Sequence, residues 1–315
     1  MSHQALYRKF RPKTFDDVLG QEHVIRTLKN QIKTDNIAHA YLFSGIRGTG
    51  KTSTAKIFSR AVNCLNNHDG NPCNECEICK SILDETNMDV IEMDAASNNG
   101  VEDIRELRDK VNFLPVKSKY KVYIIDEVHM LSKGAFNALL KTLEEPPEYL
   151  LFILATTEPQ KIPATILSRC QRFDLKRINT SVIVESMKKI CEEIGVEYDE
   201  KALKLIASNS EGAMRDAQSI LDRCLSFNNN EKVDYETVID LLGTVNYQVI
   251  LEAANCIVSR DIKNTMILVD NILNEGKEVS IFLDELIICF RNMLIIKTTN
   301  STDNLMRISE EVGRY

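Results

Sequence analysis

The sequence contains one complete phosphate-binding loop pattern, made of Gly45, Ile46, Arg47, Gly48, Thr49, Gly50, Lys51 and Thr52. It lies directly between an apolar, strand-like segment (40–44) and a helical pattern. The glycines let backbone N–H groups turn inward around an anion, and the dipole of the following helix adds to the attraction. In this pattern the lysine contacts the β- and γ-phosphates of a nucleotide and the threonine hydroxyl binds Mg²⁺. A Gly-rich turn before a helix is the alternative, and eight residues in register between these flanks disfavour it.

Two adjacent carboxylates, Asp126 and Glu127, follow a second apolar segment, Val122–Ile125. Ligands of open parallel sheets bind at the carboxyl edge of the strands, so these side chains are expected beside the phosphate-binding loop. There Asp126 would reach the Mg²⁺ ion, and Glu127 would orient or deprotonate an attacking water. Acidic residues often end strands without a chemical role, so it is the pairing with the loop that indicates phosphoryl transfer.

Four of the nine cysteines lie close together as C-x₈-C-x₂-C-x₂-C, at Cys64, Cys73, Cys76 and Cys79. Four thiolates can close a tetrahedron around Zn²⁺ at about 2.3 Å each, which leaves no open position for chemistry. We therefore expect a structural zinc module at about residues 63–80, folded by its metal because the segment has few apolar side chains. A disulfide would need an oxidising compartment, and a catalytic thiol would need a partnered histidine. The isolated cysteines are expected to be small buried residues: Cys170, Cys191, Cys224, Cys256 and Cys289.

Charge is distributed unevenly along the chain. All 315 residues sum to −7 (39 Lys and Arg against 46 Asp and Glu), but residues 1–60 sum to +7. A polyanion is therefore expected to bind the N-terminal part. No run approaches the ~18 apolar residues of a membrane helix, and the opening MSHQALYRKF lacks the apolar core of a signal peptide. We expect a cytoplasmic protein with reduced thiols and no membrane partner.

Short apolar segments rich in branched residues alternate with helical patterns in the first half of the chain. The predicted strands are 40–44, 90–94, 121–126, 150–155 and 171–174. The predicted helices are 21–33, 51–62, 101–112, 132–144 and a turn at 163–167. This alternation predicts an α/β fold with a parallel sheet.

Beyond residue 178 the strand patterns stop, and a small all-helical domain is expected. Amphipathic helices are predicted at 180–194, 199–208, 214–225 and 235–242, then from about 245 to 258, and at 262–273 and 279–296. In the last of these, Phe282, Leu286, Phe290 and Leu294 are expected to share an apolar face. We therefore expect three domains, at 1–178, 179–243 and 244–315. The short polar end of the sequence leaves open that the last domain belongs to a longer chain.

The order of these motifs resembles that of ATPases of the AAA+ superfamily, whose clamp-loader members hold adenine with an N-terminal box. The residues YRKFRPKTFDDVLGQ, at 7–21, are similar to that box. The resemblance implies that Tyr7, Arg11, Pro12 and Val18 line the base pocket. It also implies an AAA+ sheet domain followed by a helical lid and a helical collar. Without the resemblance, the same residues would be interpreted as a solvated basic loop.

Three further residues lie where these ATPases have side chains that sense the phosphates. Arg169, in Ser168-Arg169-Cys170, matches an arginine that clamp loaders extend into the ATP site of a neighbouring subunit. Such an arginine is worth on the order of 10³–10⁵ in rate where it is best measured. Arg215 matches the lid arginine near the γ-phosphate of its own subunit, and Thr157 matches a residue that positions the lytic water. Alone, each arginine would be interpreted as a surface ion-pair partner.

The cysteine insert and the continuation 126–132 (DEVHMLS) narrow the resemblance to the gamma/tau subunits of bacterial DNA polymerase III, over residues 3–225 and more loosely beyond. The resemblance implies an ATP-driven loader that uses ATP, Mg²⁺ and Zn²⁺. Its partners would be the delta and delta′ subunits, other copies of itself, the beta sliding clamp, and primer–template DNA bound by the assembled ring. Two alternatives are a non-catalytic scaffold like the delta′ subunit and a hexameric DNA-translocating motor. The intact nucleotide motifs disfavour the first, and the cysteine insert together with Ser168-Arg169-Cys170 disfavours the second.

Sequence signals for DNA contact are weak. The segment 98–100 is Asn-Asn-Gly, and the following helix carries Arg105 and Arg108 among acidic residues. We therefore expect sequence-independent, salt-sensitive DNA binding by the assembled ring and little by the single chain. His129 is expected to pack or to support the neighbouring carboxylates, because no second histidine is spaced for a metal.

Overall fold

A computed structural model describes residues 4–227, 232–243, 247–274 and 279–299. The chain forms two compact units. The first contains the residues up to 186 together with 210–219, and the second contains 187–209 and the residues from 220 onward. The division into domains at 1–178, 179–243 and 244–315 stays a prediction.

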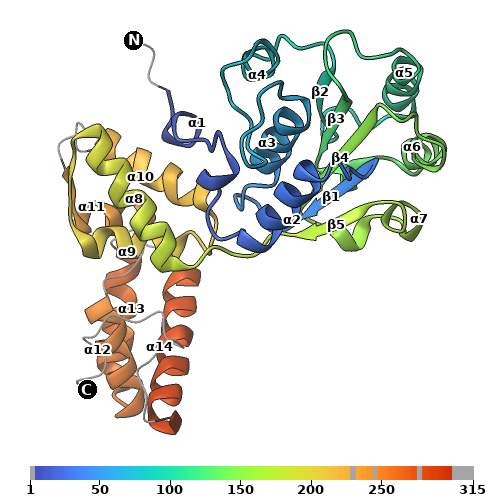
Figure 1. Cartoon of the computed structure of the whole chain (residues 1–315). Coiled ribbons are helices and arrows are strands. Elements are labelled where there is room, and N and C mark those ends of the chain that lie inside the picture. Colours follow the sequence, from blue (N-terminus) through green and yellow to red (C-terminus); the bar gives the residue numbers. More distant parts are fainter. Residues whose placement is uncertain (1–3, 228–231, 244–246, 275–278, 300–315) are drawn as a thin grey trace. The chain divides into compact units, whose positions relative to one another are not determined.

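Five parallel strands form the sheet of the first unit, in the order β2-β3-β4-β1-β5 (Figure 1). Their bounds are β1 Ala40–Ser44, β2 Val90–Asp94, β3 Lys121–Asp126, β4 Leu150–Thr156 and β5 Gln171–Asp174. Ser44 lies opposite Thr156, and Asp94 lies opposite Asp126. Because every neighbouring pair is parallel, all five strands end at the same edge. The predicted strands and the parallel sheet are confirmed.

The helices of the first unit follow the predicted ones closely. Their bounds are α1 Leu6–Lys9, α2 Glu22–Lys33, α3 Lys51–Asn63, α4 Glu77–Leu83, α5 Val101–Val111, α6 Lys133–Glu144 and α7 Ala164–Leu167, with 3₁₀ turns η1 Phe15–Asp17, η2 Val128–Met130 and η3 Pro159–Lys161. The sequence patterns do not predict α1 or α4. These helices have only four and seven residues, too few for a clear apolar period.

Helices cover both faces of the sheet (Figure 1). On one face, Leu28 of α2 and Phe58 of α3 are fully buried in a cluster with Tyr41 of β1. On the other, α5, α6 and α7 cover strand residues such as Phe152. The inner strands β1, β3 and β4 are buried along almost their whole length, which is why they appear in the sequence as continuous apolar runs.

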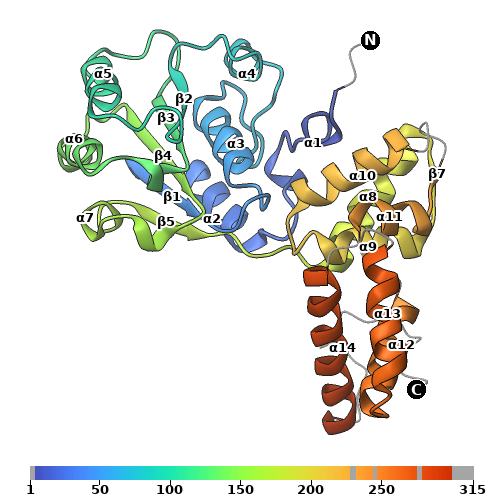
Figure 2. The ribbon, with the colours of Figure 1, turned by 180° about the vertical axis from the view of Figure 1, so that it is seen from behind.

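Two helices, α8 (Thr180–Ile194) and α10 (Met214–Phe227), begin in the first unit and end in the second. The second unit also contains α9 (Glu200–Asn209) and α11 (Tyr235–Leu242). Between these helices β6 (Glu197–Tyr198) and β7 (Lys232–Val233) form a short parallel pair, and β7 is visible in Figure 2. The expectation of an all-helical domain is therefore wrong in this detail, because strands of two residues carry no recognisable period.

The remaining helices are α12 (Tyr247–Val258), α13 (Ile262–Asn274) and α14 (Val279–Thr299), which pack together around an apolar cluster that includes Ile250, Ile272 and Phe282 (Figure 2). On the predicted apolar face of α14, Phe282 and Leu286 are buried and Phe290 packs against the same cluster, whereas Leu294 is 64% exposed.

Of the isolated cysteines, Cys191, Cys224 and Cys289 are buried as expected, but Cys170 and Cys256 are only half-buried, so the expectation of burial is wrong for these two. None of the helices that the structure describes combines the length and the apolar character needed to cross a bilayer.

Asp89 anchors the loop that leads into β3. The residue is 2% exposed, and its carboxylate accepts the backbone N–H groups of Val116 (2.7 Å), Lys117 (2.9 Å) and Ser118 (2.9 Å). Burial by itself would raise the pKa of this carboxyl, but the amide donors outweigh burial and hold the pKa below its ordinary value.

Replacing Asp89 by Asn should lower the free energy of unfolding by roughly 2–3 kcal/mol, because an N–H group would then face the amide donors. The folded pKa lies below the unfolded value of about 4, so the carboxylate stabilises the fold fully above that pH. This contribution is lost as the pH falls through the folded pKa. The difference between wild type and variant in urea unfolding should therefore shrink below about pH 4. Asp109→Asn, at an exposed carboxylate on α5, is the control, and a pH-independent loss in the Asp89 variant would contradict this role.

Candidate functional site

The phosphate-binding loop leaves the sheet next to its central strand. It joins the end of β1 to the start of α3, and β4 lies between β1 and β3. Along the carboxyl edge, the end of β4 therefore lies next to the start of the loop, and the end of β3 lies one strand further away. In open parallel sheets this edge is where ligands bind.

Two glycines of the loop lie where a side chain does not fit. Gly45 has a φ of +153°, and a Cβ atom there would lie 2.6 Å from the carbonyl oxygen of Leu175. Gly48 has a φ of +80°, and its Cβ would lie 2.8 Å from the Cβ of Ala213, just before α10. Both the backbone conformation and the close packing therefore require glycine.

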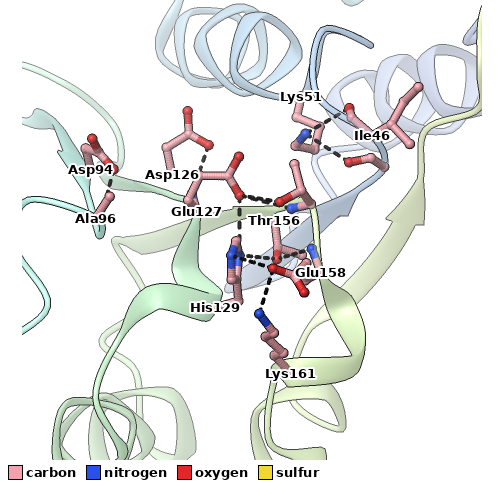
Figure 3. Close-up of polar contacts among 12 residues, drawn as sticks. Ile46, Lys51, Asp94, Ala96, Asp126, Glu127, His129, Thr156, Glu158 and Lys161 are labelled. Atoms are coloured by element: carbon pink, nitrogen blue, oxygen red, sulfur yellow. Dashed lines mark hydrogen bonds and ion pairs between the residues drawn. The ribbon is translucent and has the colours of Figure 1, made fainter. Parts of the chain in front are cut away.

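Lys51 is the first residue of α3 and is only 5% exposed. Its Nζ donates hydrogen bonds to the carbonyl oxygens of Gly45 (2.9 Å) and Ile46 (3.0 Å), as Figure 3 shows. Burial lowers the pKa of Lys51, and the nearby carboxylates of Glu127 and Asp126 oppose that shift. A buried cation at the N-terminus of a helix suits a polyanionic ligand.

Thr52 and Asp126 are in direct contact. The Oγ1 of Thr52 donates a hydrogen bond to Oδ2 of Asp126 at 2.7 Å, although the residues belong to α3 and β3. A hydroxyl and a carboxylate are the hard oxygen ligands that Mg²⁺ takes in nucleotide sites. The chemistry of this pair fits the predicted magnesium ligands.

Glu127 is held against the end of β4. Its φ of 47° is left-handed, a conformation that is uncommon for residues other than glycine and that concentrates at functional sites. Its Oε2 accepts hydrogen bonds from the backbone N–H and from Oγ1 of Thr157, both at 3.0 Å. The structure thus brings together two predicted site residues that lie thirty positions apart in the sequence.

His129 connects several polar groups behind Glu127 (Figure 3). Its side chain is 6% exposed, and its Nδ1 lies 3.3 Å from Oε2 of Glu127 and 3.0 Å from Oγ1 of Thr156. Its Nε2 lies 3.4 Å from Oε1 of Glu158, which also pairs with Lys161 at 2.8 Å. Thr156 and Glu158 are not among the predicted site residues, because their only signal in the sequence is a position at or just after the end of a strand.

The N-terminal segment reaches the loop and the start of α3. Arg11 Nε donates to Oγ of Ser53 at 3.2 Å. Val18 is buried, with its Cγ1 4.0 Å from where a Cβ of Gly50 would lie, and Pro12 is half-buried. Of the predicted base-pocket residues in this segment, Arg11 and Val18 therefore lie near the phosphate-binding loop.

Arg215 and Tyr7 also lie together. The guanidinium carbon of Arg215 is 4.9 Å from the centroid of the Tyr7 ring, a cation–π contact. The Cβ of Arg215 lies 3.4 Å from where a Cβ of Gly48 would be, so the start of α10 is packed against the loop.

Arg169 lies apart from these residues. Its guanidinium donates to Oε1 of Glu144 and to the carbonyl oxygen of Thr165, each at 2.8 Å, and a third of its side chain is exposed. Across the described ranges, no hydrogen bond or ion pair joins Arg169 to the phosphate-binding loop or to Glu127.

The four clustered cysteines converge on one point. Their Sγ atoms all lie within 4.8 Å of one another, and those of Cys73 and Cys79 are 4.0 Å apart. Sulfurs bound at ~2.3 Å to one tetrahedral ion would be about 3.8 Å apart, so this spacing fits a metal ion. The prediction of a four-cysteine metal site is therefore supported by geometry.

The backbone around these cysteines is arranged to hold thiolates. The Sγ of Cys73 accepts the N–H groups of Glu75 (3.5 Å) and Cys76 (3.3 Å). Burial opposes the effect, but these amides lower the pKa of Cys73 to about 6, whereas burial raises the pKa of Cys64 and of Cys79. A metal ion that bound all four sulfurs would displace the remaining thiol protons.

The chain should hold one divalent ion at these cysteines. Loading with Co²⁺ should give thiolate-to-metal charge-transfer absorption, and Cys76→Ser should weaken metal binding by about tenfold or more. Cys256→Ser, at a half-buried isolated cysteine, is the control and should leave the spectrum unchanged. A chelator should unfold the segment around α4 but leave the sheet intact, because the sheet has its own apolar core. Identical cobalt spectra in the wild type and all four Cys→Ser variants would rule out this ligand set.

The arginines considered for DNA contact pair with acidic residues of their own helix. On α5, Arg105 lies 2.5 Å from Glu102, and Arg108 lies 3.2 Å from Asp109. These exposed pairs leave little uncompensated positive charge, in keeping with the weak DNA signal in the sequence.

Two family models match the chain. The model described as DNA polymerase III, delta subunit matches residues 20–179, and the model described as DNA polymerase III clamp loader subunit, ATPase lid domain matches residues 182–230. A solved structure of the Thermotoga maritima RuvB Holliday junction branch migration motor has a TM-score of 0.54 and 20% identity over 79% of each chain. At this identity the likeness concerns the fold alone, and with the five-stranded parallel sheet it confirms the predicted α/β architecture.

Curated relatives match nearly the whole chain. The tau subunit of Bacillus subtilis is 51% identical over 97% of this chain and 54% of its own length. The tau subunit of Escherichia coli is 44% identical over 91% of this chain and 44% of its own length. The chain therefore spans about half the length of these two relatives. The gamma subunit of Buchnera aphidicola is 42% identical over 91% of this chain and 79% of its own length. By sequence, by fold and by the order of its motifs, the chain belongs to the family of DNA polymerase III tau and gamma subunits.

Proposed function

We propose that the chain is the ATPase part of a clamp-loader subunit, which binds and hydrolyses ATP to place a sliding clamp on primed DNA. The observation that carries this proposal is the set of contacts at the carboxyl edge of the sheet. There Lys51 contacts the loop after β1, Glu127 contacts Thr157 after β4, and Asp126 of β3 contacts the start of α3. A charged clamp, a magnesium pair and a water-orienting carboxylate are what phosphoryl transfer requires.

The nucleotide would bind with its phosphates in loop 45–52 and its base against the N-terminal segment. Lys51 would exchange its loop carbonyls for β- and γ-phosphate oxygens, and the loop amides would complete the cradle. Mg²⁺ held by Thr52 and Asp126 would neutralise charge on the same phosphates. The base pocket would be lined by Tyr7, Arg11, Pro12 and Val18.

Glu127 would orient the attacking water and accept its proton. The water oxygen bonds to the γ-phosphorus, the bond from that phosphorus to the β–γ bridging oxygen breaks, and ADP and inorganic phosphate result. Thr157 would fix the carboxylate through its two hydrogen bonds, with His129 behind it. Arg215, next to the loop at Gly48, would respond to the γ-phosphate.

Arg169 would act in the ATP site of a neighbouring subunit. In the single chain it is partly exposed and paired with Glu144, so an incoming phosphate could replace that carboxylate. Catalysis would then be shared between chains. The proposed partners are the delta and delta′ subunits, other copies of the chain, the beta sliding clamp, and primer–template DNA held by the assembled ring in the cytoplasm.

We also propose that the ion at the four cysteines is Zn²⁺. Tetrahedral sites made only of thiolates favour zinc among the common divalent ions, and such sites are structural because no position is open.

The alternative functions are weaker. The intact Lys51, Thr52, Asp126 and Glu127 argue against a scaffold without nucleotide chemistry. Identity of 51% to a tau subunit, against 20% to the branch migration motor, argues against a translocating motor.

Glu127→Gln should keep ATP affinity but lower hydrolysis by on the order of 10²–10⁴, because the proton acceptor is lost. Lys51→Ala should instead abolish ATP binding. Calorimetry would measure binding, and phosphate release with partner subunits, clamp and primed DNA would measure turnover. Glu22→Gln, at an exposed position on α2, is the matched control. Loss of ATP affinity in the Glu127 variant would show that this residue serves binding instead.

Arg169→Ala should leave ATP binding unchanged and lower turnover by on the order of 10³ in the assembled complex. The single chain should hydrolyse ATP at the same slow rate with or without the substitution. Arg26→Ala, at an exposed arginine of α2, controls for the loss of surface charge. A binding defect in the isolated Arg169 variant would mean that this arginine acts in its own subunit.

A further inference from the structure

Two asparagines of the cysteine module, which we define as residues 64–79, grip the N-terminal segment. The Oδ1 of Asn71 accepts the backbone N–H of Phe15 at 3.0 Å, and its Nδ2 donates to Oδ2 of Asp16 at 2.7 Å. The Nδ2 of Asn74 donates to the carbonyl oxygen of Lys13 at 3.1 Å. Module and segment are therefore joined by three hydrogen bonds between residues more than fifty positions apart.

A buried arginine reinforces this junction. Arg60 of α3 is 3% exposed, and burial lowers its pKa to about 10. Its Nη2 donates to the same carbonyl oxygen of Lys13 at 3.0 Å, and its Nε donates to Oδ1 of Asn74 at 3.2 Å. Arg60, on the helix that follows the phosphate-binding loop, therefore contacts both the module and the segment.

The module also rests on α2. Gly70 has a φ of +82°, and a Cβ atom there would lie 2.9 Å from the Cα of Lys29, so the two backbones are in close contact. Lys29 pairs with Asp16 at 2.5 Å and lies 4.0 Å from Asp69, which also pairs with Lys33. Lys29 of α2 therefore links the module, through Asp69, to the segment, through Asp16.

The gripped segment leads directly to the proposed base pocket. Between Phe10 and Val18 its regular structure is limited to the three residues of η1, where Oγ1 of Thr14 donates a hydrogen bond to Oδ2 of Asp17 at 2.8 Å. On one side of it lies Arg11, bonded to Ser53, and on the other lies Val18, against Gly50. A segment with so little structure of its own needs outside contacts to hold these side chains still.

We propose that the cysteine module positions the adenine-contacting segment, so that closing the module with its metal sets the affinity for the base of the nucleotide. This inference rests on the proposed function. Asn71 and Asn74 are positioning residues, because they act on residues 13–16 and not on the ligand. Loss of the metal would free the loop that carries both asparagines, while the phosphate-binding loop would stay in place on β1 and α3.

The test compares two ligands of the metal-loaded full chain, Mg·ATP and Mg·tripolyphosphate, which share phosphates but differ in the base. The variant combines Asn71→Ala with Asn74→Gly, because glycine accommodates the φ of 58° at position 74. Asn66→Ala, at an exposed asparagine of the same module, is the control. Calorimetry measures affinity, hydrogen exchange follows the amides of residues 13–17 and of β1, and atomic emission gives the metal content.

We expect the double variant to keep its metal and to bind ATP about three- to tenfold more weakly, with unchanged tripolyphosphate binding. Exchange should accelerate at residues 13–17 but not in β1, and removal of the metal by a chelator should reproduce both effects. Unchanged ATP affinity in the variant and in metal-depleted protein would overturn the inference. So would equal weakening of both ligands, which indicates general loosening. A wild type that binds no ATP would overturn the proposed function, and the exchange data would still decide whether the module holds the segment.

Discussion

The parallel alignment of β1, β4 and β3 is the constraint on which the candidate site depends. Adjacent strands are ~4.8 Å apart, so the ends of β1 and β3 are separated by about two strand spacings, with the end of β4 between them. The phosphate-binding loop and the first turn of α3 cross that gap, which is how Thr52 meets Asp126 across seventy-four positions of sequence. If β1 and β3 were further apart in the sheet, the phosphate-binding loop and Asp126 would both be present in the sequence but could not contact each other.

Charge at this edge is concentrated and partly shielded from water. Lys51 is almost fully buried, Glu127 is fixed by Thr157, and the carboxylates near Lys51 oppose the loss of its proton. Burial of charged groups without complete pairing is costly. In the proposed function, a nucleotide with its metal ion would supply the charge that completes this arrangement, and its binding would therefore stabilise the edge.

The cysteine module and the N-terminal segment illustrate how parts with little apolar surface are held. Asp89 is a simpler example of a polar side chain that holds a loop, since its carboxylate accepts hydrogen bonds from three consecutive backbone amides. In the module, the clustered cysteines and the asparagine side chains, together with the buried Arg60 of α3, take over the role that apolar packing has in the sheet. Polar contacts of this kind are directional, and they therefore fix position more tightly than apolar contacts of similar strength.

The sequence by itself determined the features that depend on neighbouring residues. The loop 45–52, the paired Asp126 and Glu127, the cysteine spacing and the buried strands are all local patterns, and the structure contains each of them. Only the tertiary structure decided which distant residues meet. The contact of Thr157 with Glu127, the position of His129 and the bonds of Asn71 and Asn74 depend on strand order and on loop packing. The pairing of β6 with β7 and the exposure of Leu294 could not be foreseen either, because two-residue strands have no period and the end of a helix is apolar or exposed according to what packs against it.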